Sequence, residues 1–297
     1  MLIVLPVSVS DRNLIPSFLA SIERCGNIKN HDVVVLTTPS AAIEAGELAG
    51  EMAKYCSSSK VVKMDIDPQG GWPTAPNLQF NYAVNWIAEN APQSHWYWME
   101  LDCTALKPGW ADALDLEYRE SRKVFMGTVA PTIKIGNPNT PQAESYQEGT
   151  HMVGTGLYPP VMPQWCIFWR YPLSGEPFDV LMQYETMKSL HDTKLIQHQL
   201  RTVNYHMDGD YIVGEDQAKL MGQTFSGRLS EDAVVHHGCK DGSLSKLLGS
   251  MGKKEETKKP EETGGKEDDT TEIIPPGKRP RGKPQVKLPE DTEEPGL

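Results

Sequence analysis

Apolar residues in the first hundred positions alternate between two spacings. The run Leu2–Val9 is almost continuously apolar and ends in a polar turn, after which apolar residues recur at helical spacing from Leu14 to Ile22. The same alternation predicts further strands and helices, at Val33–Leu36, Ser40–Tyr55, Val61–Met64, Pro76–Asn90 and Trp96–Met99. Short apolar strands separated by helices are typical of a mostly parallel sheet covered on both faces. We therefore predict an α/β, Rossmann-like fold, although no GxGxxG motif is present.

Beyond Trp110 the periodicity is weaker. We expect a helix at Ala111–Arg119 and a strand at Val124–Val129, followed by an irregular Pro- and Asn-rich excursion. A further helix is predicted at Phe178–Glu185. His191–His198 is interpreted as a helix whose two terminal histidines lie on one face as ordinary polar positions, in preference to a metal site.

Composition divides the chain into two parts. The sequence has 297 residues, 38% of them hydrophobic, enough for one core of about 250 residues. From residue 251 onward Lys, Glu, Asp, Pro, Gly and Thr dominate, which predicts a disordered tail after a folded domain of residues 1–250. From Lys253 the tail holds ten Lys and Arg against twelve Asp and Glu, so the body carries about nine of the eleven net negative charges. An acidic body disfavours nonspecific binding to a phosphate backbone, although Lys278–Lys283 is basic.

Cysteine usage and hydropathy indicate the compartment. The five cysteines are scattered and never spaced as CxxC, which disfavours a disulfide framework and a structural zinc (Cys25, Cys56, Cys103, Cys166 and Cys239). The N-terminus lacks a basic region and a cleavage site, and no stretch approaches the roughly 18 apolar residues of a membrane span. We expect a cytoplasmic protein that does not contact the membrane.

Ligands of open α/β sheets bind at the carboxyl ends of the strands, which here are Pro6–Asp11, Thr37–Ser40, Asp65–Pro73 and Glu100–Thr104. The last of these carries two carboxylates, Glu100 and Asp102, directly after an aromatic strand. Two residues apart on an extended chain, they point the same way, so one binds a hard cation while the other acts through water or a ligand hydroxyl. Asp102 could alternatively cap the turn before Lys107.

The segment Trp96–Trp110 resembles the metal motif of GT-A glycosyltransferases. It is a strand ending in a D-x-D-like pair, here Glu100 and Asp102, followed by an apolar residue and Pro-Gly-Trp. The resemblance implies a GT-A fold with a nucleotide-binding half at residues 1–104 and an acceptor half at 105–250. It also implies a bound Mn²⁺ or Mg²⁺ with Asp102 as a ligand.

Two further segments occur in the order expected for that family. Gly70–Phe80 combines a Gly-rich turn, the ring of Trp72 and Asn77 near a helix start, which suit a base and ribose. In Val234–Leu244 strand alternation puts His236 and His237 on opposite faces, and we expect His237 to bind the metal and Lys240 to face the diphosphate. The resemblance adds the remaining nucleotide contacts, Pro6, Val7, Ser8, Asp65, Glu100 and Leu101.

Two stretches are candidates for the sugar and acceptor. Gly154, Thr155 and Gly156 form a dense small-residue run that would lie beside the sugar, or a tight bend between strands. An inverting reaction would need a carboxylate base, for which Asp179 and Glu185 compete.

The sequence as a whole predicts a metal-dependent glycosyltransferase that uses a nucleoside-diphosphate sugar, a UDP-sugar being favoured. Small enzymes of this kind with charged tails occur among phage and bacterial proteins, so the acceptor could be a hydroxymethylated base in phage DNA, a polysaccharide or a protein side chain; a phage-encoded chain would act in the host cytoplasm. The alternatives are a sugar nucleotidyltransferase and a non-catalytic nucleotide- or nucleic-acid-binding protein on the same fold.

Overall fold

The computed structural model describes residues 1–135, 145–162, 175–202, 205–209, 211–214 and 226–256. Residues Met1–Thr257 form one compact unit. Cys166 and the predicted tail from residue 257 onward lie outside the described residues. None of the helices in the described part of the chain combines the length and the apolar character that a membrane crossing needs.

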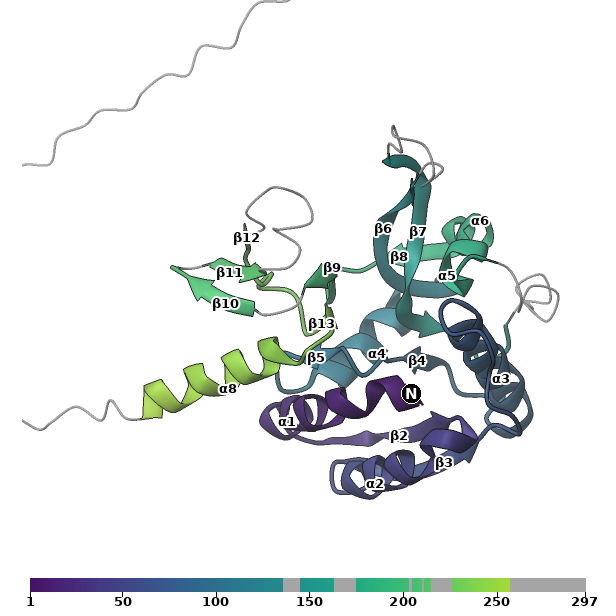
Figure 1. The fold of residues 1–297 in the computed structure, drawn as a ribbon, viewed down its shortest axis with the longest axis horizontal. Helices are drawn as coiled ribbons and strands as arrows, with labels where there is room; N and C mark the ends of the chain where they lie inside the picture. The colour runs from purple at the N-terminus through teal and green to yellow at the C-terminus, as the bar shows by residue number, and fades with distance from the viewer. Residues whose placement is uncertain (136–144, 163–174, 203–204, 210, 215–225, 257–297) are drawn as a thin grey trace, which may run out of the picture. The chain divides into compact units, whose positions relative to one another are not determined.

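The alternation of strands and helices predicted for the first hundred residues is present in the structure (Figure 1). These elements are β1 (Leu2–Val7), α1 (Ile15–Cys25), β2 (Ile28–Thr37), α2 (Ala42–Met52), β3 (Cys56–Lys63), α3 (Thr74–Asn90) and β4 (Trp96–Trp98). Short 3-10 turns at Val9–Leu14 and Pro39–Ala41 precede α1 and α2. Pro16 at the start of α1 and Gly26 with a φ of 83° at its end explain why that helix begins and ends where it does.

The second half contains longer strands and shorter helices. Its elements are β5 (Thr104–Ala105), α4 (Trp110–Ser121), β6 (Phe125–Ile135), β7 (Ser145–Tyr158), α5 (Phe178–Leu181), α6 (Gln183–Thr186), the 3-10 turn Met187–Ser189, β8 (Leu190–Asp192), β9 (Ile196–Thr202), β10 (Tyr205–Asp208), β11 (Tyr211–Gly214), β12 (Ser226–Gly227), β13 (Val235–Cys239) and α8 (Ser243–Glu256). The predicted helix over 178–185 is interrupted at Met182. The helical interpretation of His191–His198 is wrong, because β8 pairs with β6 and β9 pairs with β13.

Seven strands form the central sheet in the order β3-β2-β1-β4-β7-β6-β8. Strands β3, β2, β1 and β4 are parallel to one another, β6 and β8 are also parallel, and β7 is antiparallel to both of its neighbours. The predicted fold class, α/β with a mostly parallel central sheet, is confirmed, and the arrangement is consistent with the GT-A type. Because β1 and β4 are neighbouring parallel strands, the loops that follow them meet at one edge of the sheet.

Alternate residues of the strands supply two separate cores, one on each face of the sheet. Ile3 and Leu5 of β1 pack with α1, α2 and α4, whereas Leu2 and Val4 pack with α3 and α5. The second core is aromatic, with Phe80 stacked on Phe178 at a centroid distance of 4.0 Å. Helices therefore cover both faces, as the continuous apolar strands predicted.

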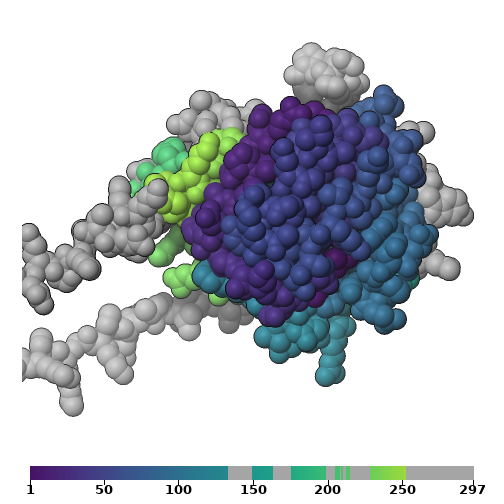
Figure 2. All heavy atoms as spheres, turned by 90° about the horizontal axis from the view of Figure 1, so that it is seen from below, coloured from purple at the N-terminus to yellow at the C-terminus, as the bar shows by residue number. Residues whose placement is uncertain are grey.

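Two three-stranded sheets extend the unit, β10-β11-β12 and β5-β13-β9. Helix α8 lies beside α1, and the two helices adjoin on the face shown in Figure 2, α8 in yellow-green and α1 in purple. Leu244, Leu247 and Leu248 of α8 form a small cluster with Tyr205. Helix α8 continues to Glu256, past residue 250, through a Lys- and Glu-rich last turn whose residues are good helix formers.

Candidate active site

A cavity of about 900 Å³ opens at the carboxyl ends of β1 and β4. Its lining comes from several parts of the chain: the loops after β1 and β4, the start of α3, strands β6, β7 and β9, helix α5, and the end of β13. The charged and titratable side chains on its wall are Asp11, Glu100, Asp102, His151, Glu176, Asp179, His198, His237 and Lys240. The cavity therefore lies at the strand ends where the sequence predicts a crevice.

The loop between β4 and β5 holds Glu100 and Asp102 in a tight turn. The Cys103 N–H donates to the Glu100 carbonyl at 3.0 Å, and the preceding Met99 N–H donates to the carbonyl of Val4 in β1 at 3.0 Å. Trp96 and Trp98 anchor the strand below this turn in the aromatic core. Asp102 is almost fully buried, whereas the Glu100 side chain is 31% exposed.

Strand β13 brings His237 and Lys240 to the same turn. Its Cys239 N–H donates to the Asp102 carbonyl at 3.1 Å, which joins the end of β13 directly to the acidic loop. His237 Nε2 lies 3.3 Å from Asp102 Oδ1 and 3.4 Å from Glu100 Oε2. Lys240 Nζ forms an ion pair with Asp102 Oδ2. Four groups from two segments that are far apart in sequence thus converge on one point.

Mutual attraction shifts the pKa values of these groups. Burial alone would raise the pKa of Asp102, but His237 and Lys240 outweigh it and hold that pKa well below its usual range. Burial would lower the pKa of His237, yet the carboxylates of Asp102 and Glu100 raise it to about 10. The positive charges of His237 and Lys240 therefore compensate the two carboxylates.

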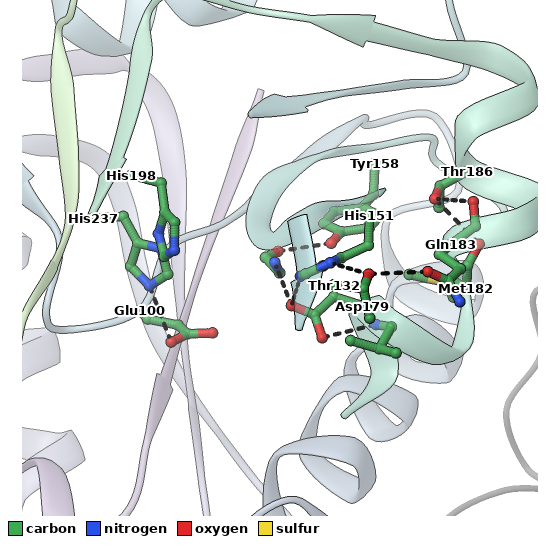
Figure 3. A network of polar contacts seen from close by, with 12 residues as sticks. Glu100, Thr132, His151, Tyr158, Asp179, Met182, Gln183, Thr186, His198 and His237 are labelled. Carbon is green, nitrogen blue, oxygen red and sulfur yellow. Dashed lines mark hydrogen bonds and ion pairs between the residues drawn. The ribbon is translucent and has the colours of Figure 1, made fainter. Parts of the chain in front are cut away.

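His198 lies against His237 from the neighbouring strand β9. The β9–β13 register pairs the two residues directly, and their Nδ1 atoms are 2.9 Å apart (Figure 3). Burial and the positive charge of His237 lower the pKa of His198 to about 3, so it is a neutral imidazole. His198 Nδ1 therefore accepts a hydrogen bond from the Nδ1–H of His237. This contact orients the His237 ring so that its Nε2 faces the carboxylates of Asp102 and Glu100.

A second polar cluster lies across the cavity, on β6, β7, α5 and α6 (Figure 3). Thr132 Oγ1 lies 2.8 Å from His151 Nδ1 and donates to Gln183 Oε1 at 3.1 Å. The other ring nitrogen of His151, Nε2, lies 3.8 Å from Asp179 Oδ2. Asp179 accepts backbone N–H bonds from Gly154 at 3.0 Å and Val180 at 2.9 Å. Burial raises the pKa of the Asp179 carboxyl despite these bonds.

Gly154 separates the two clusters. Its N–H contacts Asp179, and a Cβ added at this position would lie 3.5 Å from Glu100 Oε1 and 2.8 Å from Phe178 Cζ. Any side chain here would therefore displace an aromatic ring of the core and fill the space beside Glu100. A glycine at this point keeps the floor of the cavity open between the two clusters.

The donor atoms of the first cluster fit a divalent metal ion. Asp102, Cys103 and His237 each present a potential ligand atom within 4.8 Å of one another, and carboxylate oxygen with imidazole nitrogen suits Mn²⁺ or Mg²⁺. Burial raises the pKa of the Cys103 thiol well above its usual value, and its sulfur contacts Thr155 Oγ1 at 3.7 Å. A protonated thiol is a poor ligand, which leaves Asp102 and His237 as the fitting pair of this group, with Glu100 Oε2 at 3.4 Å from His237 Nε2.

The structure brings together most of the residues singled out from the sequence, while others lie elsewhere. Those on the cavity wall are Pro6, Ser8, Trp72, Glu100, Leu101, Asp102, Gly154, Asp179, His237 and Lys240. Those outside it are Val7, Asp65, Asn77, Thr155, Gly156 and Glu185. Ser8 also bonds Asp11 Oδ2 through its hydroxyl, at 2.6 Å.

The residues outside the cavity have other contacts. Asn77 Nδ2 donates to the Glu176 carbonyl at 2.9 Å, and Val7 and Thr155 are fully buried. Gly156 packs against β6, since a Cβ there would lie 3.0 Å from the Met126 carbonyl. Glu185 forms an ion pair with Lys188 at 2.9 Å.

Sequence reasoning missed His151 and His198. His198 was assigned to the polar face of a helix, although only the pairing of β9 with β13 places it beside His237. His151 stands three residues before Gly154, within the Gly-rich segment that was noticed for its glycines. Alternation along β7 puts these two positions on opposite faces, yet both line the cavity, so alternation alone would have excluded one of them.

Comparisons with known proteins give distant similarities only. No family model matches the chain, and no curated protein matches it. Among solved structures, mouse xyloside xylosyltransferase 1 is 11% identical, with a TM-score of 0.41 over 80% of this chain and 96% of that one. TarS of S. aureus is 14% identical, with a TM-score of 0.41 over 65% of this chain and 35% of that one. A Bacillus anthracis protein described as a glucose-1-phosphate thymidylyltransferase is 9% identical, with a TM-score of 0.40 over 65% and 86%. Similarities this distant do not assign a function, which depends on the residues of the site.

Proposed function

We propose that this protein is a metal-dependent glycosyltransferase that moves a sugar from a nucleoside-diphosphate sugar to an acceptor hydroxyl. The observation that carries the proposal is the convergence of Asp102, Glu100, His237 and Lys240 on the cavity wall. In this assignment Asp102 and His237 hold Mn²⁺ or Mg²⁺, Glu100 supports them, and the half-exposed Lys240 turns towards the diphosphate. A bound metal supplies positive charge that stabilises the departing diphosphate.

The charge on the cavity wall supports a metal requirement. Its described lining has five carboxylates, from Asp11, Glu100, Asp102, Glu176 and Asp179, against two cationic groups, Lys240 and the protonated His237. A nucleoside diphosphate would be repelled from this surface unless a divalent ion came with it. We favour a UDP-sugar as the donor on the resemblance to GT-A enzymes, with Pro6, Ser8 and Trp72 beside the nucleotide.

The same charges bear on the acceptor. A hydroxymethylated DNA base arrives with a phosphate backbone that the acidic wall disfavours, so we propose an uncharged hydroxyl acceptor, such as one on a polysaccharide or a protein side chain. Of the two candidate acidic bases, Asp179 lines the cavity and Glu185 does not. Asp179 is therefore the carboxylate that we place near the acceptor.

The nucleotidyltransferase alternative is less well supported by the loop after β1. Such enzymes normally carry a Gly-rich, basic loop at that place. Here the loop lines the cavity with Ser8, Ser10, Asp11 and Asn13, and its one basic residue, Arg12, forms an ion pair with Glu44 in α2. A non-catalytic binding protein would share the nucleotide site and differ only in turnover.

The test is a thermal-unfolding screen of UDP, GDP, CDP, ADP and TDP, each with and without Mn²⁺. A nucleotide at about 100 times its Kd adds roughly 2.7 kcal/mol of stability, and we expect one nucleotide to raise the Tm by on the order of 5–10 °C only when Mn²⁺ is present. Asp102→Asn should abolish this shift, whereas the exposed Glu120→Gln, a matched acid-to-amide change on α4, should keep it. No shift with any nucleotide, or an unchanged shift in Asp102→Asn, would contradict the proposal.

Turnover separates the enzyme from the binding protein. Release of the free nucleotide from its sugar donor, measured with Mn²⁺, is expected of the enzyme. Metal-dependent binding without any release would favour the non-catalytic alternative.

A further inference from the structure

His151 lies on the cavity wall across from Asp102 and His237. It belongs to a chain of hydrogen bonds in which each donor and acceptor can be assigned. The Gln183 Oε1 atom only accepts, so Thr132 Oγ1 donates its proton to Gln183 and offers a lone pair to His151 Nδ1. His151 must therefore carry its proton on Nδ1. Its Nε2 is left with a free lone pair beside Asp179.

Asp179 is placed to stabilise a positive charge on that ring. Its carboxylate is fixed by two backbone N–H groups, from Gly154 and Val180, and lies 3.8 Å from His151 Nε2. Burial raises the pKa of the Asp179 carboxyl, and a positive charge on His151 opposes that rise. A proton arriving on His151 would create the missing counter-charge.

We propose that His151 removes the proton from the acceptor hydroxyl, with Asp179 stabilising the imidazolium that forms. The inference rests on the proposed glycosyltransferase function and adds the base for it. In the step, the acceptor O–H bond breaks and its proton passes to His151 Nε2 while the acceptor oxygen bonds to the anomeric carbon. The bond from that carbon to the diphosphate oxygen breaks, and its electron pair leaves with the nucleoside diphosphate. Direct displacement of this kind inverts the anomeric centre.

The geometry on both sides of the cavity supports this assignment. Gly154 contacts Asp179 and borders Glu100, so a sugar held at the metal cluster would lie within reach of the His151 ring. His151 and Asp179 are 13% and 17% exposed, open to the cavity and otherwise enclosed. The charged and titratable groups that act on the pair from neighbouring elements are Glu100 and His198.

The experiment uses water as the hydroxyl acceptor, so that no natural acceptor has to be known. Hydrolysis of UDP-glucose, UDP-galactose and UDP-N-acetylglucosamine with Mn²⁺ is followed by UDP release in the full chain and in His151→Gln and Asp179→Asn. Azide is then offered in place of water, because it has no proton to lose. The control is His191→Gln, which alters a histidine paired with Glu117 at 2.7 Å outside the cavity.

We expect His151→Gln to lower hydrolysis by about 10²–10⁴-fold, while glycosyl azide formation and the Mn²⁺-dependent UDP thermal shift stay at wild-type levels. Asp179→Asn should lower hydrolysis in the same direction, and His191→Gln should change neither reaction. Wild-type hydrolysis in His151→Gln, or a product that retains the anomeric configuration, would overturn the role of His151 and leave the glycosyltransferase standing. Absence of UDP binding and of UDP release in the wild-type chain would instead overturn the proposed function itself.

Discussion

His198 Nδ1 lies 2.9 Å from His237 Nδ1, and the two rings belong to paired positions on the parallel strands β9 and β13. Because His198 is neutral and His237 is protonated, His237 Nδ1 donates in this contact and His198 Nδ1 accepts. The opposite nitrogen, His237 Nε2, faces Asp102 and Glu100 at 3.3 and 3.4 Å. His198 is therefore a positioning residue for the proposed metal ligand.

Loss of this contact should weaken metal binding without unfolding the protein. We expect His198→Phe to raise by about 10–100-fold the Mn²⁺ concentration that gives half of the UDP thermal shift, as loss of an outer-sphere partner does elsewhere. His198→Asn, which keeps an acceptor oxygen, should be affected less. His206 on β10 is exposed and outside the cavity, so His206→Phe serves as the control, and an effect of equal size there would refute the assignment.

Removal of the metal should leave the fold intact. Without a metal, Asp102 is already paired with His237 and Lys240, so its buried charge is compensated. We expect excess EDTA to abolish nucleotide binding in a calorimetric titration while the Tm of the nucleotide-free protein stays the same. A large drop in that Tm would mean that the metal is structural.

Gly154 should tolerate no side chain. In Gly154→Ala the new methyl group would meet Phe178 Cζ at 2.8 Å, and Phe178 is itself stacked on Phe80. We expect a loss of about 1–3 kcal/mol in the free energy of unfolding, measured with urea, together with reduced donor turnover. The control is Gly46→Ala in α2, where no atom lies within 4 Å and helix propensity predicts a gain of about 0.5–1 kcal/mol.

His31 should make stability depend on pH. It is 2% exposed in β2, and burial lowers its pKa in the folded state although Asp112 is 3.1 Å away. The unfolded chain then binds the proton more tightly than the folded protein does. The contribution of neutral His31 to the free energy of unfolding is therefore fully present above about pH 6.5 and is lost as the pH falls below it. Urea unfolding at pH 7.5 and 5.5 should show a smaller difference in His31→Gln than in the wild type. His206→Gln should behave as the wild type does.

The local part of the architecture could be predicted because it depends on neighbouring residues. Continuous apolar strands such as Leu2–Val7, each followed by a helix with its own start and stop signals, are enough to indicate a parallel sheet with helices on both faces. The ends of such strands form the binding edge of the sheet, so Glu100 and Asp102 could be assigned to a site before any contact was known. Alternation along a single strand also separated His237 from His236.

What only the tertiary structure decided is which distant side chains face these residues. His198 was misplaced on a helix because its seven-residue spacing from His191 suits a helical face, and only the pairing of β9 with β13 outweighs that spacing. The choice of Asp179 over Glu185, and its position beside His151, likewise depends on how α5 and α6 pack against β7. Periodicity is a property of adjacent residues, whereas contacts across the cavity arise from strand pairing and core packing over many intervening residues. The sequence by itself therefore determined the fold class, the acidic half of the site and His237, and the fold determined the places of His151 and His198.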